Sequence, residues 1–147
     1  MDQTPTINVL IVADLLRDGE RLVTLLRKSG FSVHAEAVRD EDFLRGRLLL
    51  KSWDLLFMNA GNLRLSFERL QAVLKEMEID LPCIGLGFDP TTQPSLETLS
   101  DNVVFSGATD LEDPQQCALL IHQVRHELNS LQVRRELRRS AAALRDL

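Results

Sequence analysis

Short apolar runs alternate with amphipathic stretches through most of the chain. Residues 7–13 form a run rich in β-branched side chains with almost no polar interruption, which is typical of a strand buried on both faces. Four later runs have the same character: residues 31–38, 54–59, 82–86 and 102–106. Between the first four runs, apolar residues recur at helical spacing in residues 14–29, 40–51 and 66–77. The pattern predicts five strands alternating with helices.

Local signals mark the ends of the helices. Gly30 follows the first helical stretch, where a glycine in the left-handed conformation commonly ends a helix. We expect the last helix to begin at Asp113, which accepts from nearby amides, with Pro114 in the first helical position and Gln116 completing a capping box. Between the fourth and fifth strands, at most a short helix is expected around residues 95–99.

The second helix carries apolar residues at several positions. These are Phe43, Leu44, Leu48 and Leu49. The single tryptophan, Trp53, follows shortly after this helix, and we expect it to pack at the helix end.

This alternation predicts an α/β domain in which right-handed crossovers place helices on both faces of a doubly wound parallel sheet. We expect the five strands to follow the flavodoxin-like order 2-1-3-4-5, with an extended C-terminal helix. In such sheets, functional groups collect beyond the carboxyl ends of the strands. In this chain those positions are Ala13, Asp14, Asn59, Leu86, Gly87, Ser106 and Gly107.

Composition narrows the class of protein. The chain has 147 residues, enough for one domain with a core, and its formal net charge of -5 gives no support to nucleic-acid binding through a basic surface. Without an apolar run of about 18 residues or a secretory signal pattern, we expect a cytoplasmic domain that does not insert into membranes. Cys83 and Cys117 lie in apolar settings, so we expect two buried, reduced thiols and no metal or cofactor.

Three segments resemble strands of response-regulator receiver domains. They are Val-Leu-Ile-Val-Ala-Asp at 9–14, Trp-Asp-Leu-Leu-Phe-Met-Asn at 53–59 and Leu-Pro-Cys-Ile-Gly-Leu at 81–86. In that family the first strand ends in two acids, the third in the phosphate-accepting aspartate and the fourth in Ser or Thr, and the fifth carries a lysine. The acids hold Mg²⁺, the aspartate is the nucleophile, and the hydroxyl and lysine contact the acyl phosphate.

Most of these groups are missing at the matching positions. The resemblance places the two acids at Ala13 and Asp14, the acceptor at Asn59, the hydroxyl at Gly87 and the lysine at about Ser106. A neutral amide at position 59 cannot form the acyl phosphate. The chain's lysines are Lys28, Lys51 and Lys75, so no change of register supplies one from the fifth strand. The resemblance therefore implies a degenerate receiver that is not phosphorylated and is not an enzyme.

The helical pattern that begins at Pro114 continues to the end of the chain. A first apolar stripe suits packing on the sheet and consists of Cys117, Ile121, Val124, Leu128 and Leu131. A second stripe follows after a two-residue offset, at Val133, Leu137, Ser140, Leu144 and Leu147. We expect most of this helix to project, and the second stripe to form a homodimer through a short parallel coiled coil. This divides the chain into a receiver-like domain, residues 1–130, and a projecting helix or linker, residues 131–147, toward a further domain.

Arginines crowd this helix from Arg125 onward, interleaved with acidic residues. The first interpretation is the solvated face of a long helix, and the alternative is a basic docking surface.

Receiver-like domains without the acceptor, followed by such a helix, resemble the N-terminal domains of FimX-like proteins of cyclic-di-GMP signalling, in which PAS, GGDEF and EAL domains follow. The segments at 52–56 and 134–139 contribute to this resemblance. It implies dimerisation, docking or localisation by protein contact within a regulator of type IV pili and twitching motility. An alternative of a different class is a small-molecule sensor that uses the uncharged crevice at the carboxyl ends of the strands.

Overall fold

The sheet is the centre of the molecule. The computed structural model describes residues 6–12, 16–59, 65–86, 103–106 and 113–145. Its strands are β1 (Thr6–Val12), β2 (Ser32–Val38), β3 (Leu55–Asn59), β4 (Cys83–Leu86) and β5 (Val103–Ser106). They pair in parallel in the order β2-β1-β3-β4-β5, so β3 lies in the middle. The α/β class and the parallel sheet are confirmed, and the strands follow the expected order.

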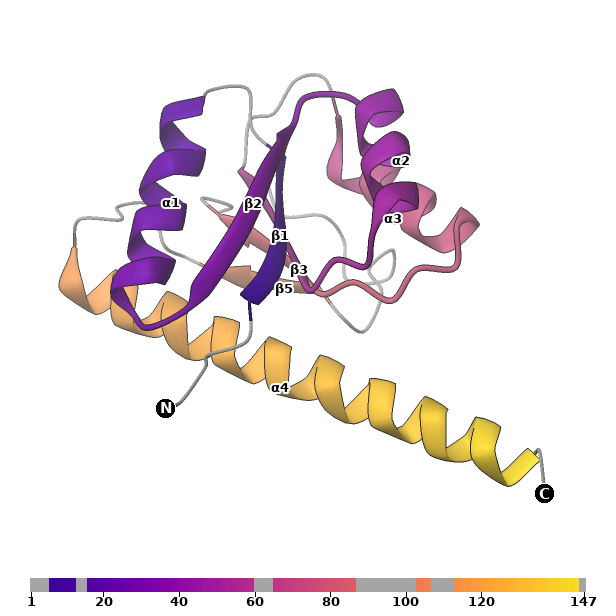
Figure 1. Cartoon of the computed structure of the whole chain (residues 1–147). Helices are drawn as coiled ribbons and strands as arrows, with labels where there is room; N and C mark the ends of the chain where they lie inside the picture. Colours follow the sequence, from indigo (N-terminus) through magenta and orange to yellow (C-terminus); the bar gives the residue numbers. More distant parts are fainter. Residues whose placement is uncertain (1–5, 13–15, 60–64, 87–102, 107–112, 146–147) are drawn as a thin grey trace.

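Helices cover both faces of the sheet (Figure 1). They are α1 (Leu16–Lys28), α2 (Glu41–Leu50), α3 (Phe67–Glu76) and α4 (Pro114–Arg145). In β3, Leu56 and Met58 pack with α2 and α3, whereas Leu55 and Phe57 pack with α1 and the first half of α4. Both faces of β3 are therefore buried, which explains the uninterrupted apolar run in its sequence.

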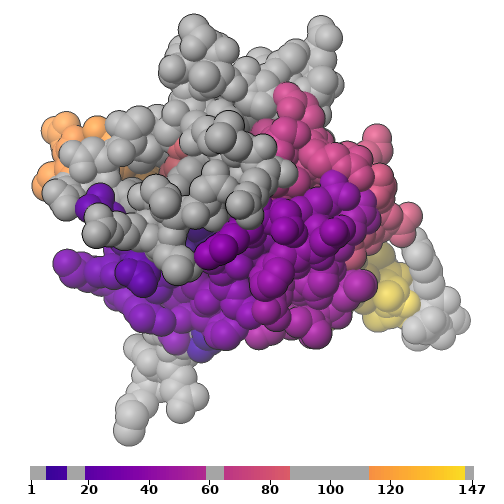
Figure 2. Space-filling model, turned by 90° about the horizontal axis from the view of Figure 1, so that it is seen from above, coloured from indigo at the N-terminus to yellow at the C-terminus, as the bar shows by residue number. Residues whose placement is uncertain are grey.

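Helix α4 is much longer than the sheet that it covers. Leu120, Ile121 and Val124 are buried in the core, and Leu131 is also buried. Seen from above in Figure 2, the start of α4 (orange) and its end (yellow) lie on opposite sides of the body. The expectation that most of this helix projects was wrong, because polar contacts with the rest of the domain extend as far as Arg138.

Helix α4 begins where the sequence predicts. The Oδ1 atom of Asp113 accepts a hydrogen bond from the backbone amide of Gln115 at 3.0 Å. The side chain of Gln116 donates to Oδ2 of the same carboxylate at 3.2 Å. Gln116 thus supports the cap by a contact between side chains that the capping-box pattern did not anticipate.

The apolar positions of α2 divide between the core and the solvent. Leu44 and Leu48 are buried, whereas Phe43 and Leu49 are exposed because they lie on the other side of the helix. Trp53 packs at the end of α2 as expected, and its Nε1 donates to the carbonyl of Arg47 at 2.8 Å. The short helix expected around residues 95–99 lies outside the described residues.

The two cysteines differ in exposure. Cys83 is buried in β4, and burial raises the pKa of its thiol to about 12. Cys117 lies in the first turn of α4, before the part of the helix that packs on the sheet, and is only half-buried. Both thiols are free, but the expectation that both are buried holds for Cys83 alone.

Two helices end on a residue in the left-handed conformation. Gly30 follows α1 with φ of 99°, as predicted, and Glu78 follows α3 with φ of 54°. In each case the next amide closes the helix by donating to one of its carbonyls, at 3.1 Å from Phe31 and 3.0 Å from Ile79. A left-handed glutamate is strained because its Cβ crowds the backbone.

These conformations predict opposite effects of one substitution at two glycines. Gly30→Ala should lower the free energy of unfolding by about 1 kcal/mol, because the backbone is left-handed there. Gly46→Ala, in the interior of α2, should raise it by about 0.5–1 kcal/mol. An added Cβ meets nothing within 4 Å at either position, so the backbone alone decides the sign. Urea unfolding at pH 7 measures both, and equal signs would contradict the assignment.

Candidate functional site

The register of the sheet aligns three strand ends at its carboxyl edge. Asn59, at the end of β3, pairs with Leu86 of β4, and Leu86 pairs with Ser106 of β5. Because neighbouring strands lie about 4.8 Å apart, Asn59 and Ser106 are separated by about 10 Å. The backbone thus brings two of the five positions assigned by the receiver resemblance to one edge.

The other receiver positions, Ala13, Asp14 and Gly87, lie outside the described residues. The assignment of the five positions to a lost phosphorylation site therefore stays a prediction. The same applies to the alternative of a small-molecule sensor, because that sensor would use the same crevice.

Two carboxylates lie at the opposite, amino edge of the sheet. Asp54 directly precedes β3, and its Oδ2 accepts from the backbone amide of Asn8 in β1 at 2.7 Å. Asp80 precedes β4, two residues after the left-handed Glu78. The two carboxylate side chains are only 18% and 20% exposed, respectively, and partly buried carboxylates require charged or hydrogen-bonded partners.

Three arginines of α4 supply these partners. Arg134 forms a bidentate pair with Asp80, at 2.8 Å from Nε and 3.1 Å from Nη2. Arg138 donates to the same carboxylate. Arg135 donates from Nη1 to Oδ1 of Asp54 at 2.8 Å. We call these five residues the arginine clasp.

The clasp changes the interpretation of the arginine-rich sequence. The sequence suggests a solvated face or a basic docking surface, but Arg134, Arg135 and Arg138 instead bind this chain's own domain. Earlier on α4, Arg125 donates to the carbonyl of Ser29 at 3.1 Å. Sequence reasoning missed these pairs because the acids and arginines are more than 50 residues apart in the chain.

The clasp lowers the pKa of Asp80. Burial by itself raises the pKa of this carboxyl, but the hydrogen bonds from Arg134 and Arg138, together with their positive charges, outweigh burial. The carboxylate form is therefore favoured in the folded protein.

A small hollow lies beside the clasp. Its volume is about 230 Å³, and Leu48, Lys51, Ser52, Trp53, Ile79, Asp80, Arg135 and Arg138 line it. Pockets for small molecules usually measure about 300–1,000 Å³, so the hollow is small for a metabolite.

An apolar stripe on α4 faces away from the clasp. Val133, Leu137 and Leu144 are 47%, 63% and 70% exposed, and Ser140 between them is also exposed. At about 100° per residue, these four positions lie on the side of the helix opposite Leu131 and the clasp arginines. We call Val133, Leu137, Ser140 and Leu144 the outward stripe; Leu147, the last position expected in it, lies outside the described residues.

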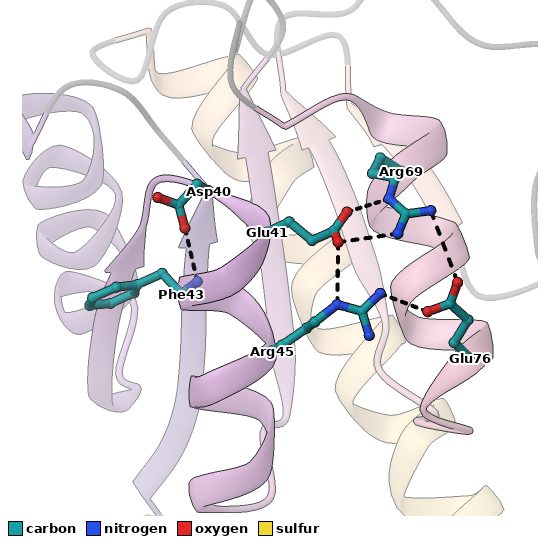
Figure 3. A network of polar contacts seen from close by, with 6 residues as sticks. All are labelled: Asp40, Glu41, Phe43, Arg45, Arg69 and Glu76. Atoms are coloured by element: carbon teal, nitrogen blue, oxygen red, sulfur yellow. Dashed lines mark hydrogen bonds and ion pairs between the residues drawn. The ribbon is translucent and has the colours of Figure 1, made fainter.

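A second polar network joins α2 to α3 (Figure 3). Glu41 accepts from Arg45 and Arg69, and Arg45 also donates to Glu76 at 2.6 Å. Hydrogen bonds from Arg69, then Arg45, lower the pKa of Glu41 despite some desolvation. The network lies on the surface, so it contributes little to stability and mainly fixes α2 and α3 side by side.

The described residues contain no candidate metal site and no candidate membrane-spanning helix. No group of three or more His, Cys, Asp or Glu side chains there is arranged to hold a metal ion. Among the same residues, no helix combines the length and apolar character needed to cross a membrane.

Comparison with solved structures identifies the fold. The receiver domain of a signal transduction histidine kinase from Syntrophus aciditrophicus matches with a TM-score of 0.64 and 23% identity, over 84% of this chain and 90% of that one. The N-terminal domain of a response regulator/sensory box/GGDEF three-domain protein from Carboxydothermus hydrogenoformans matches with a TM-score of 0.65 and 17% identity, over 86% and 98%. The chain therefore has the receiver fold.

A third match includes a coiled coil. It is a fusion of a trimeric coiled-coil segment of yeast Spc42 to another protein of solved structure, with a TM-score of 0.70 and 16% identity, over 99% of this chain and 94% of that one. No protein-family model matches this chain, and no curated protein does. At these identities the matches establish the fold alone.

The paired state of Asp80 predicts a stability change that depends on pH. Asp80→Asn should lower the free energy of unfolding at pH 7 by about 1–2 kcal/mol, because it removes a carboxylate that accepts charged hydrogen bonds. The folded pKa lies below the ordinary 3.8, so the contribution is complete above about pH 5 and is lost as pH falls through 3.8 and below.

Urea unfolding between pH 3 and pH 7 measures this difference. Glu136→Gln neutralises an exposed carboxylate on the same helix and should change stability by less than about 0.5 kcal/mol. A loss for Asp80→Asn that is equally large at pH 3 and pH 7 would show that the carboxylate charge is not its source.

Proposed function

We propose that this chain is a receiver-fold signalling domain that works by protein contact without phosphorylation, and that α4 joins it to a second copy. The observation that carries the proposal is the outward stripe. Three large apolar side chains lie exposed on the helix face that points away from the domain, and an apolar stripe at heptad-like spacing is the usual seam of a coiled coil.

The residues at the receiver positions support a role without phosphate chemistry. Asn59 offers an amide where a carboxylate nucleophile is needed. The lysine that would offset the charge of an acyl phosphate has no candidate, because the chain contains no lysine after Lys75. On this proposal the domain is not an enzyme and needs no cofactor.

The proposal also gives the domain a place in a larger regulator. One structural neighbour is the N-terminal domain of a protein with sensory box and GGDEF domains. We propose that residues 1–130 form the receiver-like head and that residues 131–147 lead into PAS, GGDEF or EAL domains of a cyclic-di-GMP regulator, acting in twitching motility. The head would then set the assembly or location of the downstream domains.

The outward stripe predicts a weak, parallel association. In the heptad frame Leu137 and Leu144 take the a positions, while Val133 and Ser140 take the d positions. A serine in the seam weakens the contact, and the described stripe spans only about two heptads. We therefore expect a dimer that dissociates on dilution.

The dimer is tested by the solution mass. Light scattering across a range of concentrations should give a mass that rises from 16.6 kDa toward twice that value. Leu137→Glu places a charge in the seam and should leave a monomer at every concentration. A rise toward three chains would replace the dimer by a trimer, and a monomeric parent chain would exclude self-association through the stripe.

Leu119→Glu provides a matched control. Leu119 is 66% exposed on the same helix, but about four helical turns, which carry His122 and His126, separate it from Val133, where the outward stripe begins. The mass of this variant should equal that of the parent chain. If both variants lose the dimer equally, the contact is not confined to the outward stripe.

Absence of phosphorylation is tested directly. The chain incubated with Mg²⁺ and acetyl phosphate should gain no phosphoryl mass by intact-protein mass spectrometry. Asn59→Asp should also stay unmodified, because the lysine of the receiver site is still missing. A phosphoryl adduct on the parent chain would overturn the proposal.

A further inference from the structure

Helix α4 is held on the domain in two different ways. Its first part is fixed by apolar packing, since Leu120, Ile121 and Val124 are buried in the core and Leu131 is 1% exposed. Beyond Leu131, the described large apolar residues of the helix are exposed. The contacts described there are instead the ion pairs of the arginine clasp. Leu131 is therefore the last apolar anchor.

The clasp also determines the rotation of the helix about its axis. Leu131, Arg134, Arg135 and Arg138 follow one another at spacings of three, one and three residues, so they lie on one side of α4. Two carboxylates on different segments receive the arginines: Asp54 before β3 and Asp80 before β4. Two separate attachment points restrict both tilt and rotation, which a single pair could not do.

The geometry of the clasp is well defined on the domain side. The carboxylate of Asp54 is fixed by the amide of Asn8, and Arg135 also donates from Nη2 to the carbonyl of Trp53 at 2.9 Å. On the other side, the left-handed Glu78 turns the chain from α3 toward Asp80. A strained residue that places a functional group is a recognised use of backbone strain.

We propose that Asp54 and Asp80 are positioning residues for the outward stripe: through Arg134, Arg135 and Arg138 they hold the last third of α4 in one direction and turn the stripe away from the domain. The clasp is opened by disrupting its ion pairs, and α4 then pivots beyond Leu131. The clasp rests on the described contacts alone, whereas its role in presenting an interface rests on the proposed function.

Partly exposed ion pairs suit such a role. The clasp arginines are 33%, 34% and 57% exposed, and ion pairs in contact with water are individually weak and are screened by salt. Together they hold one geometry, yet a competing anionic group or high salt can displace them. Apolar packing would instead fix the helix permanently.

The direction of α4 is measurable by pulsed electron spin resonance between two spin labels. One label is placed at Ala142→Cys on α4 and the other at Glu68→Cys on α3; both positions are exposed. Cys117 is replaced by serine, while Cys83 is buried and unreactive. Leu137→Glu is included so that only distances within one chain contribute.

The intact clasp should give one narrow distance distribution. Replacing Arg134, Arg135 and Arg138 by glutamine should broaden or shift it, with the helix content by circular dichroism unchanged. Arg139→Gln is the control, because Arg139 is exposed next to Arg138, and should keep the narrow distribution. A distribution that stays narrow without the clasp arginines, or that is already broad with them, would overturn the proposal.

Two further measurements keep the outcomes separate. In 1 M salt the distance distribution of the protein with an unmutated clasp should broaden in the same way. This tests the ion pairs without any substitution that could disturb folding. With Leu137 restored, the clasp variant should dimerise about tenfold more weakly, because the stripe is no longer held in place. If the parent chain is monomeric, the dimer proposal fails. The distance measurement still shows whether the clasp holds α4 in one direction.

Discussion

A parallel sheet has to be covered on both faces, and this requirement shapes the whole molecule. The two faces of β3 are filled by separate clusters, one with α2 and α3 and the other with α1 and α4. Without α4, the face formed by Leu55 and Phe57 would be open to water on the side toward β5. The first half of α4 is therefore required to cover the sheet, whereas its second half is not needed for this purpose.

That division separates α4 into a first part that belongs to the core and a second part that ion pairs hold on the domain. Up to Leu131, the side chains of α4 are selected for packing against the sheet. Past this residue the inner side carries arginines and the outer side carries leucines, which reverses the usual arrangement of apolar residues toward the domain. Such a reversal is expected where a helix leaves one surface and prepares to meet another.

Much of the fold could be predicted from the sequence, because its signals are local. The uninterrupted run at β3, the glycine at position 30 and the Asp113-Pro114 start each specify their element through neighbouring residues. The burial of Trp53 against the end of α2 followed from the same local logic.

The clasp could not be predicted, because it depends on distances across the fold. Asp80 and Arg134 are 54 residues apart, and neither segment carries a sequence signal that identifies the other as its partner. The reach of α4 along the domain was underestimated for the same reason. An interleaved arrangement of arginines and glutamates is typical of a solvated helix. The arginines instead pair with Asp54 and Asp80, which lie in the segments before β3 and β4.

The carboxyl edge of the sheet presents the opposite case. The receiver resemblance predicts five positions there, from Ala13 to Ser106, and the register places Asn59 and Ser106 at one edge. On the proposed function, this edge lacks the acceptor carboxylate and the lysine that phosphoryl transfer needs. The amino edge, to which the receiver resemblance gives no role, carries the ion pairs of the arginine clasp.

The length of α4 beyond Leu131 makes it a lever. The helix extends about 21 Å from that residue to its described end at a rise of 1.5 Å per residue. A tilt of about 20° at this point would therefore move the tip by about 7 Å, slightly less than the distance of about 8–10 Å between the axes of two packed helices. Small rearrangements among a few ionic contacts at the amino edge of the sheet would thus become larger displacements at the tip of the helix.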